Sequence, residues 1–335
     1  MKQTMSRKTK VGVIGVGHLG NLHAKMYDMI PAADFIGIYD IDNDRAQEVA
    51  NRFGVKAYPN IEALLHDIEA VSVVTPTSNH FETASLALNH GVHVFIEKPI
   101  TADVQSAGEL ITLARGKNQI VQVGHIERFN PALMSLKSIG LNPMFIESHR
   151  LSQFNPRGTD VAVVLDLMIH DIDIILSFVN SPVKQIDANG VAIVSDSIDI
   201  ANTRIQFDNG AVANITASRI SQKKMRKMRV FQPNAYITID FLDGFAEVFR
   251  LFTDDTATPE SGMVLGEIGV GEQKKKIVYE RPDVPDINAL EYELAEFIAA
   301  VQKGTSPLVT AIEGKKALEV ALEVMEKIKG QTVPW

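Results

Sequence analysis

The sequence contains no cysteine, and that absence excludes several kinds of chemistry. Without a thiol among its 335 residues, the chain has no disulfide bond, no thiolate zinc site and no cysteine nucleophile. Such a chain is compatible with the reducing environment of the cytoplasm. We therefore expect a cytoplasmic protein whose stability and chemistry depend on other side chains.

Long apolar runs and excess positive charge are also missing. No segment approaches the roughly 18 consecutive apolar residues that a membrane span needs, and the polar segment 1–10 lacks the apolar core of a secretory signal. The formal net charge is −8, which argues against nonspecific nucleic-acid binding and leaves only a local basic patch open. We expect neither a membrane nor a nucleic acid as a partner.

The composition that remains is typical of a globular protein, with 45% apolar and 22% charged residues. The chain is longer than one hydrophobic core usually organises, so two domains are expected. After Gly124 the pattern changes from short apolar strands alternating with helices to longer strands with alternating polarity. We place the first domain at residues 1–124 and the second at residues 125–335.

A glycine-rich loop follows the first expected strand. The segment VGVIGVGHLG is an apolar strand that ends in Gly15-x-Gly17-x-x-Gly20 and opens a helix. In dinucleotide-binding proteins the first glycine makes a tight turn, the second admits a pyrophosphate, and the third packs helix against strand. The helix N-terminus adds amide donors. We expect this loop, with His18 and Leu19 between its glycines, to bind a dinucleotide.

An acidic residue follows this loop at the spacing that dinucleotide binding needs. Asp40 ends a second apolar run 20 residues after Gly20, as expected of the carboxylate that binds a ribose 2′-hydroxyl. A carboxylate there repels a 2′-phosphate, so NAD is favoured over NADP. The next residue, Ile41, is a further expected cofactor contact. Arg45 either softens this preference or is a solvated residue of the next helix.

Strands and helices continue to alternate up to Gly124, which predicts a doubly wound parallel sheet. Two of the expected strands end in Thr75-Pro76 and in Glu97-Lys98, so these residues fall at the same carboxyl edge as the glycine loop, where ligands bind. Taken alone, Glu97 and Lys98 are equally compatible with solvated loop charges. His80 fits either the start of a helix beside this edge or a capping or surface position.

The second half predicts a mainly antiparallel sheet with one covered face. Several segments alternate between apolar and polar residues, and Asp208-Asn209-Gly210 is typical of a hairpin turn between two of them. Residues 253–282 have the composition of a loop, and the chain closes with two helices. The expected fold is therefore α/β, with an N-terminal doubly wound parallel sheet and a C-terminal α/β domain built on a large open sheet.

Residues 160–180 combine an apolar helix pattern with chemically active side chains. Asp166, His170, Asp173 and Ser177 are spaced to share one face of a helix. A carboxylate beside a histidine fixes the ring's orientation and favours its protonated form, as for a general base with a supporting acid. A core histidine satisfied by its own i−4 carboxylate fits equally well. We expect no metal here, because one histidine among carboxylates is a poor transition-metal site.

Two basic features have open roles. Arg157 lies in a turn before this helix, within reach of an anionic ligand. The run Lys223–Arg229, KKMRKMR, is strongly basic in an acidic protein. Such a run is commonly a solvated strand or loop, and the alternative is a phosphate contact.

Together these motifs resemble the glucose-fructose oxidoreductase/inositol dehydrogenase/MocA family over essentially the whole chain. The resemblance rests on the glycine loop, Asp40, Thr75-Pro76-x-x-x-His80, Glu97-Lys98-Pro99 and Asp166-x-x-x-His170. It implies a Rossmann domain followed by a domain with an open sheet that forms homodimers or homotetramers. It also implies an NAD-dependent oxidoreductase in which Lys98 and His170 act at the substrate hydroxyl and Asp166 supports them.

Two further segments refine the expected substrate. Residues 124–131, which include Arg128, and residues 154–173 resemble family members that oxidise the 3-hydroxyl of UDP-N-acetylglucosamine on the way to the diamino sugar of lipid A. By this resemblance the substrate contacts are Lys98, Arg128, Arg157, Asp166 and His170. The alternatives are a dehydrogenase or reductase of a free sugar or inositol, and a non-catalytic regulator that senses dinucleotides.

Overall fold

The structure is a computed structural model that describes residues 7–155, 161–253, 262–270 and 274–330. The chain forms two compact units. Unit 1 comprises Met1–Phe129 and Ile287–Glu319, and unit 2 comprises Asn130–Asp286 and Val320–Trp335. This division differs from the single boundary expected at residue 124, because the segment after residue 286 returns to the first unit.

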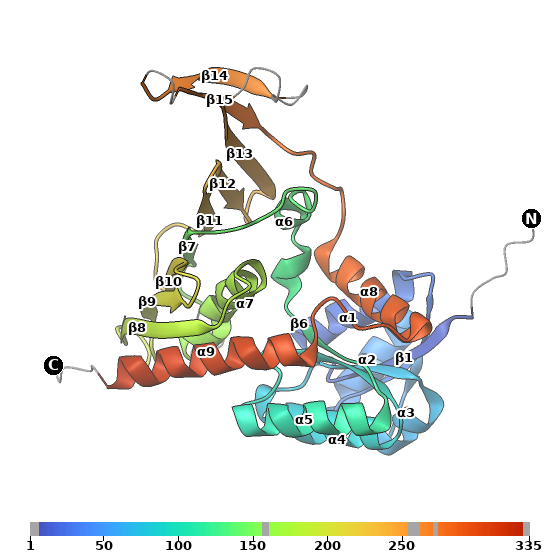
Figure 1. The fold of residues 1–335 in the computed structure, drawn as a ribbon. Coiled ribbons are helices and arrows are strands. Elements are labelled where there is room, and N and C mark those ends of the chain that lie inside the picture. Colours follow the sequence, from blue (N-terminus) through green and yellow to red (C-terminus); the bar gives the residue numbers. More distant parts are fainter. Residues whose placement is uncertain (1–6, 156–160, 254–261, 271–273, 331–335) are drawn as a thin grey trace, which may run out of the picture. The chain divides into compact units, whose positions relative to one another are not determined.

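Unit 1 is built on a six-stranded sheet whose strands are all parallel, in the order β3-β2-β1-β4-β5-β6. In Figure 1, α3, α4 and α5 lie on one face of this sheet and α1 and α8 lie on the other. This is the doubly wound sheet expected from the sequence. The strands are β1 (Thr9–Ile14), β2 (Ala33–Tyr39), β3 (Lys56–Ala57), β4 (Ala70–Val73), β5 (His93–Glu97) and β6 (Val121–Gly124).

The helices of unit 1 begin and end at residues suited to those positions. Asp42 and Asp103 accept hydrogen bonds from first-turn amides of α2 and α5, and Gly54 ends α2 with a φ of 66°. The helices are α1 (His18–Met29), α2 (Asn43–Phe53), α3 (Ile61–Asp67), η1 (Thr77–Asn79), α4 (His80–Asn89), α5 (Val104–Lys117), η2 (Ile126–Phe129), α8 (Ala289–Lys303) and the first part of α9 (Ala311–Lys329).

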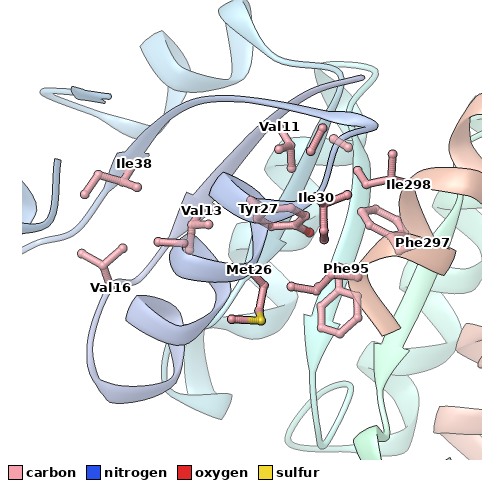
Figure 2. Close-up of a cluster of buried hydrophobic side chains, with 14 of the residues drawn as sticks. Val11, Val13, Val16, Met26, Tyr27, Ile30, Ile38, Phe95, Phe297 and Ile298 are labelled. Atoms are coloured by element: carbon pink, nitrogen blue, oxygen red, sulfur yellow. The ribbon is translucent and has the colours of Figure 1, made fainter. Parts of the chain in front are cut away.

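The core between the sheet and helices α1 and α8 joins distant parts of the sequence. Figure 2 shows Tyr27 of α1, Phe95 of β5 and Phe297 of α8 among its buried side chains. The rings of Phe95 and Phe297 meet edge to face, with centroids 5.8 Å apart. Burial of large side chains in the sheet and in α8 explains why the segment around residue 297 belongs to unit 1.

Unit 2 contains a nine-stranded sheet in the order β14-β15-β13-β12-β11-β7-β10-β9-β8. Among the described strands, β7 and β10 pair in parallel and the other neighbours are antiparallel. The expected open sheet is thus confirmed. Its strands are β7 (Phe145–Leu151), β8 (Val183–Val191), β9 (Ile200–Phe207), β10 (Val212–Ser218), β11 (Met225–Gln232), β12 (Ala235–Asp240), β13 (Phe245–Phe252), β14 (Met263–Ile268) and β15 (Lys275–Glu280).

Two expectations for unit 2 need correction. The segment 253–282 was expected to be a loop, but β14 and β15 within it pair with each other, and β15 pairs with β13. Residues 160–180 were expected to form one regular helix. Instead, one π-helical turn, η3 (Val164–Met168), continues into α7 (Ile169–Phe178). The hairpin expected at residues 208–210 is present, with Gly210 at a φ of 85°.

The remaining helical segments of unit 2 are α6 (Pro131–Met134) and the end of α9. Helix α7 packs on β7 and β10, on the sheet face that also buries Ile146, Ile215 and Val230. In the described part of the chain, no helix has the length and apolar character needed to cross a membrane.

Candidate active site

The glycine loop has the geometry that a pyrophosphate requires. Gly15 has a φ of +85°, which favours glycine, and a Cβ on Gly20 would lie 1.8 Å from the Gly15 carbonyl oxygen. A Cβ on Gly17 would instead meet only an Arg45 nitrogen at 4.0 Å. Gly17 precedes α1 and supplies no capping side chain, so the first amides of α1 are suited to an anion.

Asp40 lies beside this loop and is nearly buried. Its carboxylate accepts hydrogen bonds from the backbone amides of Val16 at 2.7 Å and Asp42 at 2.9 Å. The Arg45 guanidinium lies 3.5 Å from Asp40 and 2.9 Å from Asp42. Arg45 is therefore ion-paired with Asp40 and Asp42 rather than simply solvated. Ile41 is 89% exposed and offers an apolar surface beside the same acid.

His80, the first residue of α4, connects the ends of two neighbouring strands. Its Nε2 lies 2.9 Å from the carbonyl oxygen of Thr75, after β4, and its Nδ1 lies 2.9 Å from that of Pro99, after β5. The ring is 1% exposed, so the surface position considered from the sequence is wrong. Burial lowers the pKa of His80, and the two carbonyl contacts oppose this only in part.

The hydroxyl of Thr75 is an orphaned buried group at this edge. Its oxygen is buried and has no hydrogen-bond partner among the described residues. Such a group usually has a partner that the protein alone does not supply. Pro76 follows it directly. A polar ligand bound at the carboxyl ends of β4 and β5 would satisfy this hydroxyl.

Glu97 is the last residue of β5, and its carboxylate contacts both α1 and the backbone of the next residue. Its carboxylate lies 3.0 Å from the Nε2 of His23, and it accepts the backbone amide of Lys98 at 3.2 Å. Burial raises the pKa of Glu97, but the hydrogen bond from His23 and the nearby positive charges outweigh it, so the net pKa lies below the ordinary value. The Lys98–Pro99 peptide bond is cis. Sequence reasoning missed His23, whose place on α1 gives no motif signal.

In unit 2, Asp166 lies in the π-helical turn η3 and His170 in the first turn of α7, and both are half-buried. The π-helical turn has a wider period than an α-helix, so the expectation of one continuous helical face is not met. Asp173 is buried, whereas Ser177 is exposed and donates its hydroxyl hydrogen to the carbonyl of Ile174 at 2.6 Å. Ser177 therefore has a local structural role.

A buried ion pair fixes the helix next to His170. Arg150 on β7 donates from Nη2 to Asp171 at 2.8 Å and from Nε at 3.1 Å, and both side chains are 2% exposed. This two-point contact between a guanidinium and a carboxylate sets distance and orientation together. The guanidinium also lies over the ring of Phe241. The backbone of His170 is thereby held against the sheet through its neighbour Asp171.

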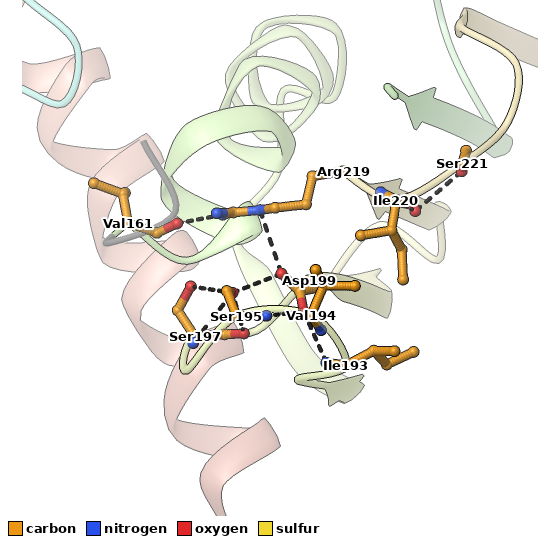
Figure 3. Close-up of polar contacts among 10 residues, drawn as sticks. Val161, Ile193, Val194, Ser195, Ser197, Asp199, Arg219, Ile220 and Ser221 are labelled. Carbon is orange, nitrogen blue, oxygen red and sulfur yellow. Dashed lines mark hydrogen bonds and ion pairs between the residues drawn. The ribbon is translucent and has the colours of Figure 1, made fainter. Parts of the chain in front are cut away.

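A second buried carboxylate, Asp199, holds the turn before β9, and Arg219 beside it contacts the segment that leads into η3 (Figure 3). Asp199 accepts the amides of Ile193, Val194 and Ser195 at 2.7–3.0 Å, and the Ser195 hydroxyl at 2.7 Å. Burial raises its pKa, but these hydrogen bonds outweigh that effect and hold the pKa well below its usual range. Arg219 lies beside Asp199 and donates to the carbonyl of Val161.

The basic features expected from the sequence have different environments. Within the run 223–229, Lys227 pairs with Asp240 at 2.9 Å and Arg229 with Glu147 at 3.5 Å. Arg128 pairs with Glu313 at 3.4 Å inside unit 1. Arg157 lies outside the described residues. Searched over the part of the chain that the structure describes, no group of three or more histidine, aspartate or glutamate side chains is arranged to hold a metal.

Comparison with known proteins agrees with this architecture. The GFO/IDH/MocA model, an oxidoreductase family with an NAD-binding Rossmann fold, matches residues 9–125. The model of the GFO/IDH/MocA C-terminal domain matches residues 143–238. The chain therefore belongs to this oxidoreductase family. It is an NAD(P)-dependent dehydrogenase acting on CH–OH groups, and NAD is its cofactor.

Relatives of known activity cover almost the whole chain. UDP-N-acetylglucosamine 3-dehydrogenase of Acidithiobacillus ferrooxidans is 37% identical over 94% of this chain and 96% of that protein. Its solved structure superposes with a TM-score of 0.86, covering 96% of this chain and 98% of the other at 34% identity. Myo-inositol 2-dehydrogenase of Thermotoga maritima is 27% identical over 92% of this chain and 93% of that protein.

Proposed function

We propose that the protein oxidises the 3-hydroxyl of UDP-N-acetylglucosamine, in the pathway to the diamino sugar of lipid A. The observation that supports this most is the 37% identity to UDP-N-acetylglucosamine 3-dehydrogenase, which extends over nearly the full length of both chains. The inositol dehydrogenase is less similar over the same span. The sequence motifs point to the same substrate. We assign the reaction to the cytoplasm.

His170 is the proposed general base and Lys98 the proposed stabiliser of the reacting oxygen. His170 accepts the proton of the substrate hydroxyl, and the charged amine of Lys98 donates a hydrogen bond to the same oxygen. Asp166 orients the base. NAD, when bound, supplies the hydride acceptor. Each role follows from the family resemblance and is compatible with the half-buried position of all three side chains.

The residues around the glycine loop fit NAD well. We propose that Gly15, Gly17, Gly20 and the first turn of α1, with His18 and Leu19, hold the pyrophosphate, and that Asp40 binds the adenosine ribose. The remaining proposed cofactor contacts are Ile41, Arg45, Thr75, Pro76, His80, Glu97 and Lys98. The orphaned hydroxyl of Thr75 supports a ligand at the carboxyl edge of β4. Arg45 beside Asp40 gives NADP a weaker alternative contact.

The proposed contacts to the nucleotide diphosphate are cationic. Arg128 and Arg157 are the candidates outside the basic run. Within the run, Lys223 and Lys224 are exposed, whereas Lys227 and Arg229 already pair with acids of the sheet. We therefore propose Lys223 and Lys224 as the members that meet phosphate, because a charge already paired gains less from an anion.

We also propose that the protein forms a homodimer or homotetramer through the sheet of unit 2. A ladder of aromatic rings crosses five neighbouring strands on the face opposite the core, with centroids 4.9–5.9 Å apart. Its members are Phe145, Phe231, Tyr236, Phe249 and Tyr279. Phe231 is exposed and the other four are half-buried, and contiguous aromatic surface of this kind commonly marks a protein interface.

The test is NAD reduction with a panel of substrates, followed by the absorbance of the reduced nicotinamide. We expect turnover with UDP-N-acetylglucosamine and a product lighter by two hydrogens in mass spectrometry. Turnover with inositol or a free sugar alone would replace the substrate proposed here. Dinucleotide binding without turnover on any substrate would favour a sensing role, against which the presence of both Lys98 and His170 argues.

A further inference from the structure

A chain of buried polar side chains runs from α1 to the residue before Lys98, and the proposed mechanism does not use it. The hydroxyl of Tyr27 lies 2.8 Å from the Oγ of Ser72, which lies 3.2 Å from the Nδ1 of His23. The Nε2 of His23 lies 3.0 Å from Glu97. The other carboxylate oxygen of Glu97 accepts the backbone amide of Lys98. Four contacts thus link α1, β4 and β5 to Lys98.

With a neutral imidazole on His23 and an ionised carboxylate on Glu97, one arrangement of hydrogens satisfies every link. Tyr27 donates to Ser72, Ser72 donates to the Nδ1 of His23, and the Nε2 of His23 donates to Glu97. Glu97 accepts a second hydrogen bond from the amide of Lys98. With the imidazole proton on Nδ1 instead, the Nε2 lone pair would face the carboxylate. All the donors therefore point toward Glu97.

Neighbouring residues confine these polar side chains. Tyr27, Ser72 and His23 are at most 1% exposed, so an unsatisfied polar atom there would cost free energy. The ring of Phe95 meets the ring of His23 edge to face, with centroids 5.4 Å apart. Burial raises the pKa of the Tyr27 phenol, and the carboxylate of Glu293 on α8 adds to this effect.

The strand beside Glu97 leaves space for its carboxyl group. Gly124 on β6 pairs with Glu97, and a Cβ on Gly124 would lie 3.1 Å from the Cδ and Oε1 of Glu97. The ring of Phe95 is nearer still, at 3.0 Å, so a side chain at position 124 would press on both Phe95 and the carboxylate. Glu97 is held from one side by His23 and given room on the other by Gly124.

We propose that His23 is a positioning residue for Lys98: it holds the carboxylate of Glu97 in place, and Glu97 fixes the backbone of Lys98 and keeps a negative charge beside its amine. This inference rests on the role proposed above for Lys98 at the substrate hydroxyl. Without the imidazole donor, Glu97 has to reorient or take up a proton. Either change releases the amide of Lys98 and removes the negative charge from beside its amine.

The first test compares two substitutions of His23 with a leucine substitution at a control histidine. Leucine removes the donor, whereas glutamine retains an N–H close to the position of Nε2. For His23→Leu we expect kcat to fall about 10- to 100-fold, with KM for NAD changed less than about twofold because the pyrophosphate and ribose contacts are elsewhere. His23→Gln should recover most of the loss.

The control is His93, at the opposite end of β5, where the half-buried ring accepts the backbone amide of Ile120 at 2.9 Å. His93→Leu should affect thermal stability as much as His23→Leu does and should leave kcat unchanged. Equal losses of kcat at the two positions would overturn the inference. If His23→Leu fails to fold, Gly124→Ala crowds the carboxylate of Glu97 with His23 intact, and we expect it to lower kcat without changing KM for NAD.

A second readout needs no substrate and separates this inference from the proposed function. Competitive acetylation of amines, quantified by mass spectrometry, reports the reactivity of Lys98 relative to the exposed Lys117 of α5. We expect His23→Leu to raise that ratio at least about threefold, because an amine that is no longer held by a neighbouring carboxylate is more available to the reagent. His23→Gln should stay close to the wild-type ratio.

The two readouts give distinct failures. If wild-type protein turns over no sugar nucleotide but the acetylation ratio changes as described, the proposed function fails and the link from His23 to Lys98 stands. If wild-type protein is active and His23→Leu changes neither kcat nor the ratio, His23 is a packing residue only and the inference is wrong.

Discussion

The two units hold their candidate site residues in different ways. In unit 1, Asp40, Thr75 and Glu97 lie at or just after the carboxyl ends of parallel strands in one sheet, so sheet register alone brings them to one edge. In unit 2, Asp166 and His170 lie on a π-helical turn and the helix that follows it. That helix is fixed by a buried ion pair from β7. A site at strand ends needs only the sheet, whereas a site on a helix needs an anchor.

This difference predicts which properties a substitution affects. Removing a polar contact near Lys98 should reduce activity more than stability, because the sheet of unit 1 keeps its register through its apolar core. Removing an anchor of α7 should reduce both, because a charge is left buried without its partner. The predictions below test that contrast, from the largest expected effect to the smallest.

The largest effect is expected at the proposed catalytic residues of either unit. His170→Ala and Lys98→Met should each lower kcat by about 10²- to 10⁴-fold, because they remove the proposed proton acceptor and the hydrogen-bond donor. Steady-state kinetics measures the loss, and NADH fluorescence titration is the control for cofactor binding. Wild-type turnover in either variant would contradict the assigned roles.

Asp171→Ala should destabilise the protein by about 3–5 kcal/mol, because it leaves the guanidinium of Arg150 buried without its carboxylate. Urea unfolding followed by circular dichroism measures this free energy. The control is Glu147→Ala, which removes an exposed ion pair with Arg229 and should cost less than about 1 kcal/mol. Equal costs would show that the Arg150–Asp171 pair does not anchor α7.

Cofactor preference should depend on Asp40. Asp40→Ser removes a charged acceptor for the ribose, and we expect NAD affinity to fall about tenfold or more, at about 1.5–3 kcal/mol per charged hydrogen bond. NADP affinity should rise for two reasons. The carboxylate that repels a 2′-phosphate is gone, and Arg45 no longer pairs with Asp40. The double variant Asp40→Ser/Arg45→Ala should lose the NADP gain. Unchanged NAD binding would remove Asp40 from the cofactor site.

The smallest expected effect is on the loss of stability at acid pH, to which His80 contributes. Burial lowers the pKa of His80 below its ordinary value of 6.5, so below that pH the unfolded chain binds more protons than the folded one and stability falls as pH decreases. The loss ends once pH is below the folded-state pKa. His80→Gln should flatten the dependence of Tm on pH between about 7 and 5. An unchanged slope would assign the acid sensitivity to His93, whose pKa is also lowered by burial.

The strand-end positions of unit 1 could be predicted from the sequence because parallel strands leave a local pattern. Apolar runs of four to six residues ending in Asp40, Thr75 and Glu97 sufficed to place these residues at one edge. The ion pairs of unit 2 left no such pattern. Asp199 directly precedes β9 and Arg219 directly follows β10, so the two side chains meet only in the folded protein. No sequence pattern predicts this contact.

The same distinction explains why two sequence-based predictions for unit 2 were wrong and why His23 was not predicted. A π-helical turn and an α-helix share the same apolar composition over residues 164–178, so periodicity could not separate them. The strand β14 is exposed along its whole length and β15 buries only Val278, so neither alternates between buried and exposed residues. His23 meets Glu97 across 74 residues of sequence, a distance that spacing arguments do not reach.

The most direct test of the central claim uses UDP-N-acetylglucosamine that has deuterium at C3 of the sugar. The protein should transfer that deuterium to NAD, so mass spectrometry should find the reduced nicotinamide one unit heavier, and His170→Ala should abolish the transfer. Reduced cofactor without deuterium would show that another position is oxidised. No reduction at all in the presence of wild-type protein and NAD would contradict the assignment of this substrate.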